Sequence, residues 1–250
     1  MFKATIDNIS KFKDALTAIS ELISEGSFMA KKEGLFFTAT DPTMVTLVDF
    51  KFMATAFETY KVDKDTEINL SLDNIMGVLR RAKSTDKVIF ELDDTTNKLK
   101  INLEGISIRK FTIPLLDLEK AEVPEMNLEF PSTVEITTDI FSDGIADASI
   151  ITDTMILSTT ATEFQMLAEG DMSDTQMTVK SGTDGVIGIA TKGDDAKAKY
   201  SLEYLKKMEK GAKLSKTVKI QFGTDYPLKV TFQEKDVVSI SYILAPRVDD

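Results

Sequence analysis

Lysines are the side chains whose spacing points most clearly to a chemical role. Lys206, Lys210 and Lys213 are spaced to fall on one face of a helix, where their ammonium groups could contact nucleic-acid phosphates. A solvated helix end explains the same pattern, because the helix dipole favours cations at a C-terminus. The 250-residue chain contains no His and no Cys, which excludes Ser-His-Asp triads, cysteine nucleophiles and Cys/His zinc sites. We therefore expect no catalytic residue, no metal and no cofactor.

The acidic residues do not suggest an enzyme either. A carboxylate hydrolase needs two acids that converge in one cleft, and the scattered Asp and Glu residues identify no such pair. The pair Asp93-Asp94 and the terminal pair Asp249-Asp250 lack calcium-loop spacing. The glycine-rich stretch 182–188 has no Gly-Lys-Ser/Thr, so we interpret it as a loop or hairpin tip.

The charge of the chain is unevenly distributed. The formal net charge is −11 with a pI near 4.7, and a uniformly acidic surface would repel DNA. Segments 72–83 and 202–213 are nevertheless net positive, whereas segment 138–151 carries Asp139, Asp143 and Asp147. Any DNA contact must therefore use the local clusters of Lys and Arg.

The elements that must position these clusters are predicted from periodicity. Residues 9–24 place Phe12, Leu16 and Ile19 at helical spacing. A second helix is predicted over 72–82, with Ser71 as its N-cap. Period-two patterns predict strands at 2–6, 35–39 and 45–50, and a meander at 88–92, 99–103 and 106–113.

The same order of elements returns about 130 residues later. Ser71-Leu72 matches Ser201-Leu202, and Phe12 and Leu16 match Phe141 and Ile145. Helices are predicted at 139–151 and 202–213, with strands at 218–222, 228–232 and 237–243. The sequence thus predicts an α+β chain of two duplicated domains of antiparallel sheet with two helices each, at 1–114 and 132–250, joined by a proline-containing connector at 115–131.

The start of the chain shows no hydrophobic leader, and no stretch of 18 apolar residues occurs. We expect an intracellular protein without a membrane partner, in the cytoplasm or nucleoid of an archaeon or in the nucleus of a eukaryote.

Short motifs distributed over the whole chain carry a family resemblance. They are Met1-Phe2-Lys3-Ala4, Asp41-Pro42-Thr43-Met44-Val45, Leu115-Leu116-Asp117-Leu118 and the stretch from Tyr242 to Val248. Residues 1–250 resemble proliferating cell nuclear antigen (PCNA), the DNA polymerase sliding clamp, in its archaeal form. The resemblance implies the DNA clamp fold and a toroidal trimer around double-stranded DNA. It also implies a non-enzymatic processivity factor for replication and repair, whose partners are DNA polymerase, a clamp loader and nuclease- or ligase-type proteins.

The resemblance also implies two sets of site residues. The channel cations that would face DNA are Lys13, Arg80 and Lys210, with Lys11, Arg81, Lys83, Lys206, Lys207 and Lys213 nearby. The partner-peptide groove would take an aliphatic and two aromatic side chains between Met44, Val45, Leu47, Val123, Leu128, Pro227, Ile243, Ala245 and Pro246. The third helix departs from the family pattern, because Asp143 and Ala146 stand where many relatives are basic.

Two matters stay open from the residues. Without the family, residues 44–47 are explained as the buried face of a strand, and the whole chain could be an interaction scaffold that does not bind DNA. The subunit seam expected from the resemblance pairs residues 107–113 with residues 175–180. Homotrimer and heterotrimer are not distinguished.

Overall fold

The structure is a computed structural model and describes residues 1–93, 95–119, 127–193 and 195–248. The chain divides into two compact units, which are described separately. Unit 1 consists of Met1–Pro42, Val48–Val123 and Glu234–Ile240. Unit 2 consists of Thr43–Leu47, Pro124–Gln233 and Ser241–Asp250.

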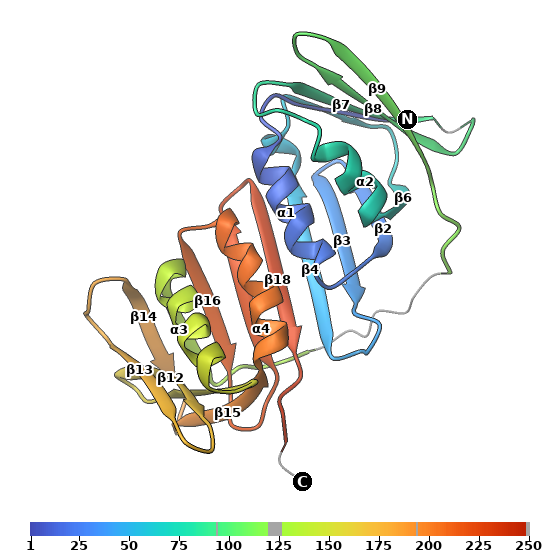
Figure 1. The fold of residues 1–250 in the computed structure, drawn as a ribbon. Coiled ribbons are helices and arrows are strands. Elements are labelled where there is room, and N and C mark those ends of the chain that lie inside the picture. Colours follow the sequence, from blue (N-terminus) through green and yellow to red (C-terminus); the bar gives the residue numbers. More distant parts are fainter. Residues whose placement is uncertain (94, 120–126, 194, 249–250) are drawn as a thin grey trace. The chain divides into compact units, whose positions relative to one another are not determined.

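The first half of the chain contains one complete set of elements. In chain order they are β1 (Phe2–Ile6), α1 (Ser10–Ser20), β2 (Glu25–Lys31), β3 (Gly34–Thr40), β4 (Thr46–Met53), the 3-10 turn η1 (Ala54–Ala56), β5 (Thr59–Val62), β6 (Thr66–Ser71), α2 (Leu72–Leu79), β7 (Lys87–Asp93), β8 (Lys98–Glu104) and β9 (Ile108–Pro114). The two helices pack against each other (Figure 1). This is the helix, strand and meander order that the sequence predicts.

The second half repeats that order. Its elements are β10 (Ser132–Thr137), α3 (Thr138–Ile151), β11 (Thr154–Thr159), β12 (Glu163–Glu169), β13 (Asp174–Lys180), β14 (Val186–Thr191), β15 (Ala196–Ser201), α4 (Leu202–Glu209), the 3-10 helix η2 (Lys210–Leu214), β16 (Thr217–Phe222), β17 (Leu228–Glu234) and β18 (Val238–Leu244). The helices α3 and α4 also pack together. The duplication predicted from sequence is confirmed, whereas the domain boundaries stay a prediction.

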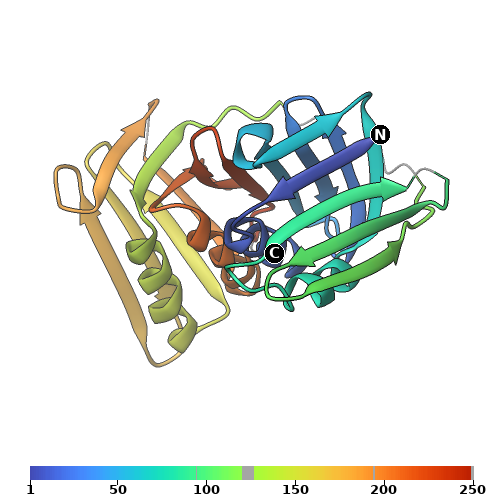
Figure 2. The same cartoon turned by 90° about the horizontal axis from the view of Figure 1, so that it is seen from above.

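Strand order gives the equivalence of the repeats. The first repeat is ordered β5-β1-β7-β8-β9 and β4-β3-β2-β6, and the second is ordered β14-β10-β16-β17-β18 and β13-β12-β11-β15. All pairings given between these strands are antiparallel. In this scheme β9 is the equivalent of β18, and β4 is the equivalent of β13. Figure 2 shows β7, β8 and β9 side by side, with β9 at the edge.

Equivalent phenylalanines fill the two cores. Phe12 of α1 packs edge-on against Phe52 and Phe90, with ring centroids 5.0 and 5.6 Å apart. Phe141 of α3 does the same against Phe232 at 6.1 Å. Both helical phenylalanines are buried, so each repeat closes its core around the same helical position.

Three helices end earlier than the periodicity predicts. Helix α1 ends at Ser20, although Leu22 and Ile23 beyond it are buried. Helix α2 ends at Leu79, and in the loop beyond it the carboxylate of Asp86 accepts the N–H of Lys83 at 3.0 Å. Helix α4 ends at Glu209 and continues as a 3-10 turn. The cap of α2 is confirmed, since Ser71 Oγ accepts from the N–H of Asn74 at 3.3 Å.

The connector is irregular over its described residues, 115–119 and 127–131. It is attached to unit 1 where the N–H of Leu116 donates to the carbonyl of Asn69 at 3.0 Å. The 182–188 stretch is a turn that enters β14 at Val186. Across the described part of the chain, no helix is long and apolar enough to span a membrane.

Candidate nucleic-acid and partner-peptide surfaces

The candidate channel cations of unit 1 come from two places. Lys11 and Lys13 lie on α1, while Arg80, Arg81 and Lys83 follow the C-terminus of α2. Lys11 forms an ion pair with Glu234 of the same unit, so its charge is largely neutralised. The other four have no side-chain ion pair with any described residue, which leaves them available to a polyanion.

A partly buried ion pair shapes the loop that carries Arg81 and Lys83. Asp86 is only 3% exposed, and its carboxylate accepts from the Arg109 guanidinium on β9. The same guanidinium donates to the carbonyl of Arg81 at 2.9 Å. Because the Asp86 carboxylate is buried, removal of Arg109 alone would leave it without its cationic partner, which is costly. Arg109 therefore holds the loop in place.

The candidate cations of unit 2 lie on α4 and η2, not on one continuous α-helix as predicted. Lys207 pairs with Glu203 at 2.8 Å and lies over the Tyr204 ring. Lys210 lies 3.7 Å from Glu209. Side chains three apart eclipse in a 3-10 helix, so Lys210 and Lys213 still share a face.

Helix α3 presents the opposite charge. Asp139, Asp143 and Asp147 are exposed and four residues apart, so they form an acidic stripe. The helix has no basic residue in its last turn. The charge of α3 is therefore opposite in sign to that of the segments that carry the candidate channel cations of α2, α4 and η2.

The groove residues that the structure describes belong to unit 2. The N–H of Ala245 donates to the carbonyl of Val45 at 3.0 Å and joins the 43–47 and 243–246 segments. Met44 is 83% exposed with a φ of 58°, and Ala245 is also exposed. Leu47 is 7% exposed, so the buried-strand interpretation holds for it. Val45, Ile243 and Pro246 are half-buried.

The remaining groove residues lie on a second pair of segments. Leu128 precedes Phe130, whose ring packs edge-on against Tyr226 at 5.8 Å. The carbonyl of Tyr226 accepts from the hydroxyl of Tyr200 at 2.7 Å and so fixes the neighbouring Pro227. Burial raises the pKa of Tyr200 strongly, so its hydroxyl stays protonated as the donor. Val123 lies outside the described residues.

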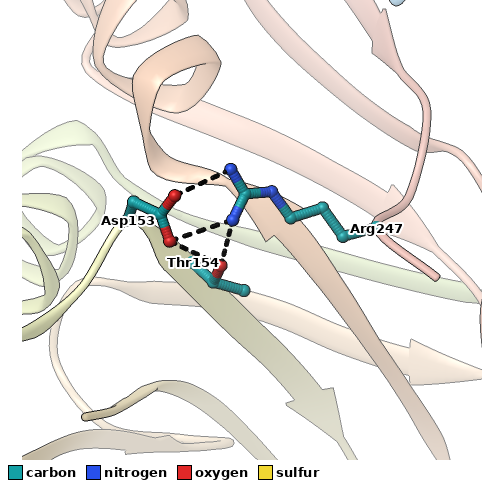
Figure 3. Close-up of polar contacts among 3 residues, drawn as sticks. All are labelled: Asp153, Thr154 and Arg247. Carbon is teal, nitrogen blue, oxygen red and sulfur yellow. Dashed lines mark hydrogen bonds and ion pairs between the residues drawn. The ribbon is translucent and has the colours of Figure 1, made fainter. Parts of the chain in front are cut away.

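Sequence reasoning missed two positioning groups of unit 2. The hydroxyls of Tyr204 on α4 and of Thr43 beside Met44 lie 2.7 Å apart and share a hydrogen bond. Arg247 in the C-terminal tail binds Asp153 and Thr154 (Figure 3). Neither contact has a sequence signal, because the partners lie 161 and 94 residues apart.

No grouping of three or more Asp or Glu residues suited to a metal ion occurs in the part of the chain that the structure describes. In unit 2, the exposed apolar side chain of Met44 lies beside two chain segments that are joined by a hydrogen bond.

Comparison with known proteins assigns the class. Models of the N-terminal and C-terminal domains of proliferating cell nuclear antigen match residues 1–123 and 122–247. The chain is 30% identical over 249 residues to the DNA polymerase sliding clamp of Thermococcus fumicolans, covering 100% of this chain and 99% of that protein. It is 33% identical over 249 residues to the DNA polymerase sliding clamp of Nanoarchaeum equitans, covering 99% and 100%.

A solved structure agrees with this assignment at the level of fold. The crystal structure of PCNA from Thermococcus kodakaraensis matches with a TM-score of 0.92 at 24% identity, covering 99% of this chain and all of that one. The chain belongs to the proliferating cell nuclear antigen family, which confirms the resemblance seen in the sequence.

Proposed function

We propose that this chain is the subunit of a DNA sliding clamp, in which three copies close a ring around duplex DNA and tether DNA polymerase. The observation that carries the proposal is that β9 and β13 are edge strands whose counterparts in the other repeat, β18 and β4, are neighbours in one sheet, in a chain of this family. The protein would act as a tether, with no bond made or broken by its own residues. Such a protein works where the chromosome lies, hence inside the cell.

The subunit seam is proposed between β9 of one copy and β13 of the next. Each lies at the end of its sheet order and pairs on one side only. An unpaired edge is a template for another strand. Because β9 corresponds to β18 and β13 to β4, the contact between β18 and β4 residues inside each unit supplies the geometry of the seam.

That template contact has a defined register. In unit 1 the N–H of Met53 donates to the carbonyl of Val237 at 2.9 Å, and in unit 2 the N–H of Ala245 donates to the carbonyl of Val45 at 3.0 Å. Both bonds fit one antiparallel register. It sets Phe50 opposite Ile240.

The strand pairings transfer this register to the seam. When the strand pairings of the two repeats are followed outward from matched residues, Phe50 of β4 takes the same position as Met177 of β13. In the same way, Ile240 of β18 takes the same position as Arg109 of β9. Arg109 of one copy therefore stands opposite Met177 of the next, and Ile108 stands opposite Thr178. Half-buried residues then meet on the helix-covered face, and exposed residues meet on the other.

Charge favours the same pairing. Helix α2 packs against β9 and is followed by Arg81 and Lys83, while α3 packs against β13 and carries the acidic stripe. The two edges are thus oppositely charged, and two copies of β13 would repel each other. This gives Asp139, Asp143 and Asp147 a role at the seam, and Arg81 and Lys83 a role besides DNA contact.

A disulfide tests the register directly, because the chain contains no Cys. Ile108→Cys with Thr178→Cys would place two thiols on directly opposite residues, about 5.5 Å apart between Cα atoms, which is within disulfide range. Oxidation should give a covalent trimer of about three 27.7 kDa chains. The control, Ile108→Cys with Gln176→Cys, shifts the pair by two residues, to about 7 to 8 Å between Cα atoms, and should stay monomeric on a denaturing gel.

The outcomes separate the alternatives. Efficient cross-linking in the control but not in the test pair contradicts the register. A particle of 28 kDa in light scattering for the unmodified protein contradicts the homotrimer. A trimer that fails to stimulate a polymerase on primed circular DNA would favour a scaffold that does not bind DNA.

The groove would bind short peptides of the polymerase, of a clamp loader and of nuclease- or ligase-type proteins. Each large apolar side chain that is fully buried contributes about 1.5 to 3 kcal/mol, so a few anchors give micromolar affinity after the cost of ordering. Support comes from the exposed Met44 beside the hydrogen-bonded segments 43–47 and 243–246.

A further inference from the structure

The C-terminal tail of unit 2, residues 245–248, is held by polar contacts rather than by apolar packing. None of its four residues is buried, and Val248 is 73% exposed. The tail is attached at two backbone points, from the N–H of Ala245 to Val45 and from the N–H of Arg247 to the carbonyl of Lys199 at 2.8 Å. A segment with so little buried apolar surface depends on its polar anchors for order.

The Arg247 side chain supplies the strongest of these anchors (Figure 3). Its Nη1 donates to Asp153 Oδ1 at 3.0 Å and its Nη2 donates to Asp153 Oδ2 at 3.1 Å. Nη1 also donates to the hydroxyl oxygen of Thr154, which in turn donates to Asp153 Oδ1 at 3.0 Å. This two-pronged geometry is specific to a guanidinium and fixes its orientation.

The receiving side of the contact is rigid. The carbonyl of Asp153 accepts from the N–H of Leu202, the first residue of α4, at 2.9 Å. Thr154 pairs with Ser201 in the β11–β15 ladder. The tail is thereby fastened to a point that the sheet and α4 already fix.

The anchor lies beside open space. A hollow of about 350 Å³ is bounded by Ile156, Lys199 and Arg247 among other residues. Arg247 lines this hollow together with Thr154, the residue next to Asp153, so the ion pair lies at its wall. Without the ion pair, the tail would depend on its backbone contacts with Val45 and Lys199.

We propose that Arg247 is a positioning residue that holds Ala245 and Pro246 in the conformation that receives the partner peptide. This inference rests on the proposed groove. Its physical basis is preorganisation, because a tail fixed beforehand need not be ordered when the peptide binds. The ion pair acts on peptide affinity without touching the peptide.

The first measurement follows the tail itself. The chain has no Cys, so Val248→Cys carries a single nitroxide label whose mobility is read by electron paramagnetic resonance. Arg247→Gln in this background should convert a restricted spectrum into a mobile one. Lys192→Gln, which removes one exposed cation elsewhere in unit 2, is the matched control and should leave the spectrum unchanged.

The second measurement uses a fluorescent synthetic peptide with one Leu and two Phe residues on unlabelled trimers. Arg247→Gln and Asp153→Asn should each weaken binding about threefold to tenfold, as expected for one exposed two-pronged ion pair. The double variant should be no weaker than either single variant, because one interaction is lost in all three. Arg247→Lys keeps the positive charge but not the two-pronged guanidinium, so its peptide affinity should lie between those of the unsubstituted protein and Arg247→Gln. The charge exchange, Arg247→Asp with Asp153→Arg, should restore part of the affinity.

Each outcome decides a different statement. A restricted label in Arg247→Gln overturns the anchor. A mobile label with unchanged peptide affinity overturns its role in the groove, and so does an additive double variant. Ile243→Asp puts an unpaired carboxylate into the groove and serves as the reference variant that should no longer bind the peptide. If its affinity equals that of the unsubstituted protein, the proposed groove is misplaced, and the inference about Arg247 fails with it while the label result stands.

Discussion

Two glycines of unit 1 should respond to the same substitution with opposite signs. Gly34 opens β3 with a φ of 150°, where an added Cβ would lie 2.3 Å from the carbonyl oxygen of Phe52 and 2.9 Å from Cα of Met53. Gly77 lies in α2, is exposed, and an added Cβ there would meet nothing within 4 Å. Gly34→Ala should therefore destabilise the unit, and Gly77→Ala should stabilise it.

The magnitudes follow from the two environments. At Gly34 the backbone conformation costs an alanine about 1 to 3 kcal/mol, and relief of two backbone clashes adds about 1 to 3 kcal/mol. At Gly77 alanine gains about 0.5 to 1 kcal/mol from lower chain entropy in the unfolded state. Each kcal/mol moves the melting temperature of a protein of this size by about 2 to 4 °C. We therefore expect the melting temperature to fall by about 5 to 20 °C in Gly34→Ala and to rise by about 1 to 4 °C in Gly77→Ala.

The assay is urea and thermal unfolding followed by circular dichroism, at one fixed protein concentration because association shifts apparent stability. An unaltered midpoint for Gly34→Ala would refute the close approach of β3 to Phe52. A loss of more than about 0.5 kcal/mol for Gly77→Ala would refute the open environment of α2.

Two further predictions concern charge. Lys13→Glu, Arg80→Glu and Lys210→Glu together should lower polymerase stimulation on primed circular DNA and make it less dependent on salt, because fewer cations displace counterions from the phosphates, while the trimer persists in light scattering; stimulation equal to that of the unsubstituted protein at every salt concentration would contradict the channel assignment. The Lys100 ammonium, with help from Thr96, lowers the pKa of Asp93 to about 2, so this carboxylate stabilises the fold above its ordinary pKa and loses that effect as pH falls through about 2. An NMR titration should give that midpoint, and Lys100→Met should raise it; an unmoved midpoint would show that the ammonium is not the cause.

The duplication could be predicted from the sequence because local hydrophobic patterns repeat in the two halves of the chain. Phe12 and Phe141 occupy the same place in two helical stripes, and both are buried. The strand β13 is different, since its residues alternate between exposed and half-buried and give little hydrophobic signal. Edge strands of this kind need the sheet order before they can be recognised.

The ends of the helices and the polar anchors could not be predicted in the same way. In the loop after helix α2, Asp86, itself held by Arg109, accepts the N–H of Lys83, and this arrangement depends on a strand that follows later in the chain. The pair of Arg247 with Asp153 joins residues 94 positions apart. Both are tertiary contacts between charged residues of common types, and no periodic pattern in the sequence predicts them. The channel and groove assignments came from family resemblance and stay predictions.

The acidic stripe of α3 has a consequence for motion along DNA. Two repeats per chain would give a ring of three copies a near-sixfold architecture, but the charge of α3 differs in sign from that of Lys13 on α1 and Arg80 at the end of α2. If the candidate cations line a channel, its electrical symmetry would then be threefold, with attractive sectors separated by weakly repulsive ones. A duplex inside it would experience a periodic rotational potential, with equivalent minima every 120°. Because phosphates wind helically, stepping between these minima would couple translation to rotation, so that the ring would tend to follow the helical path of the backbone as it diffuses.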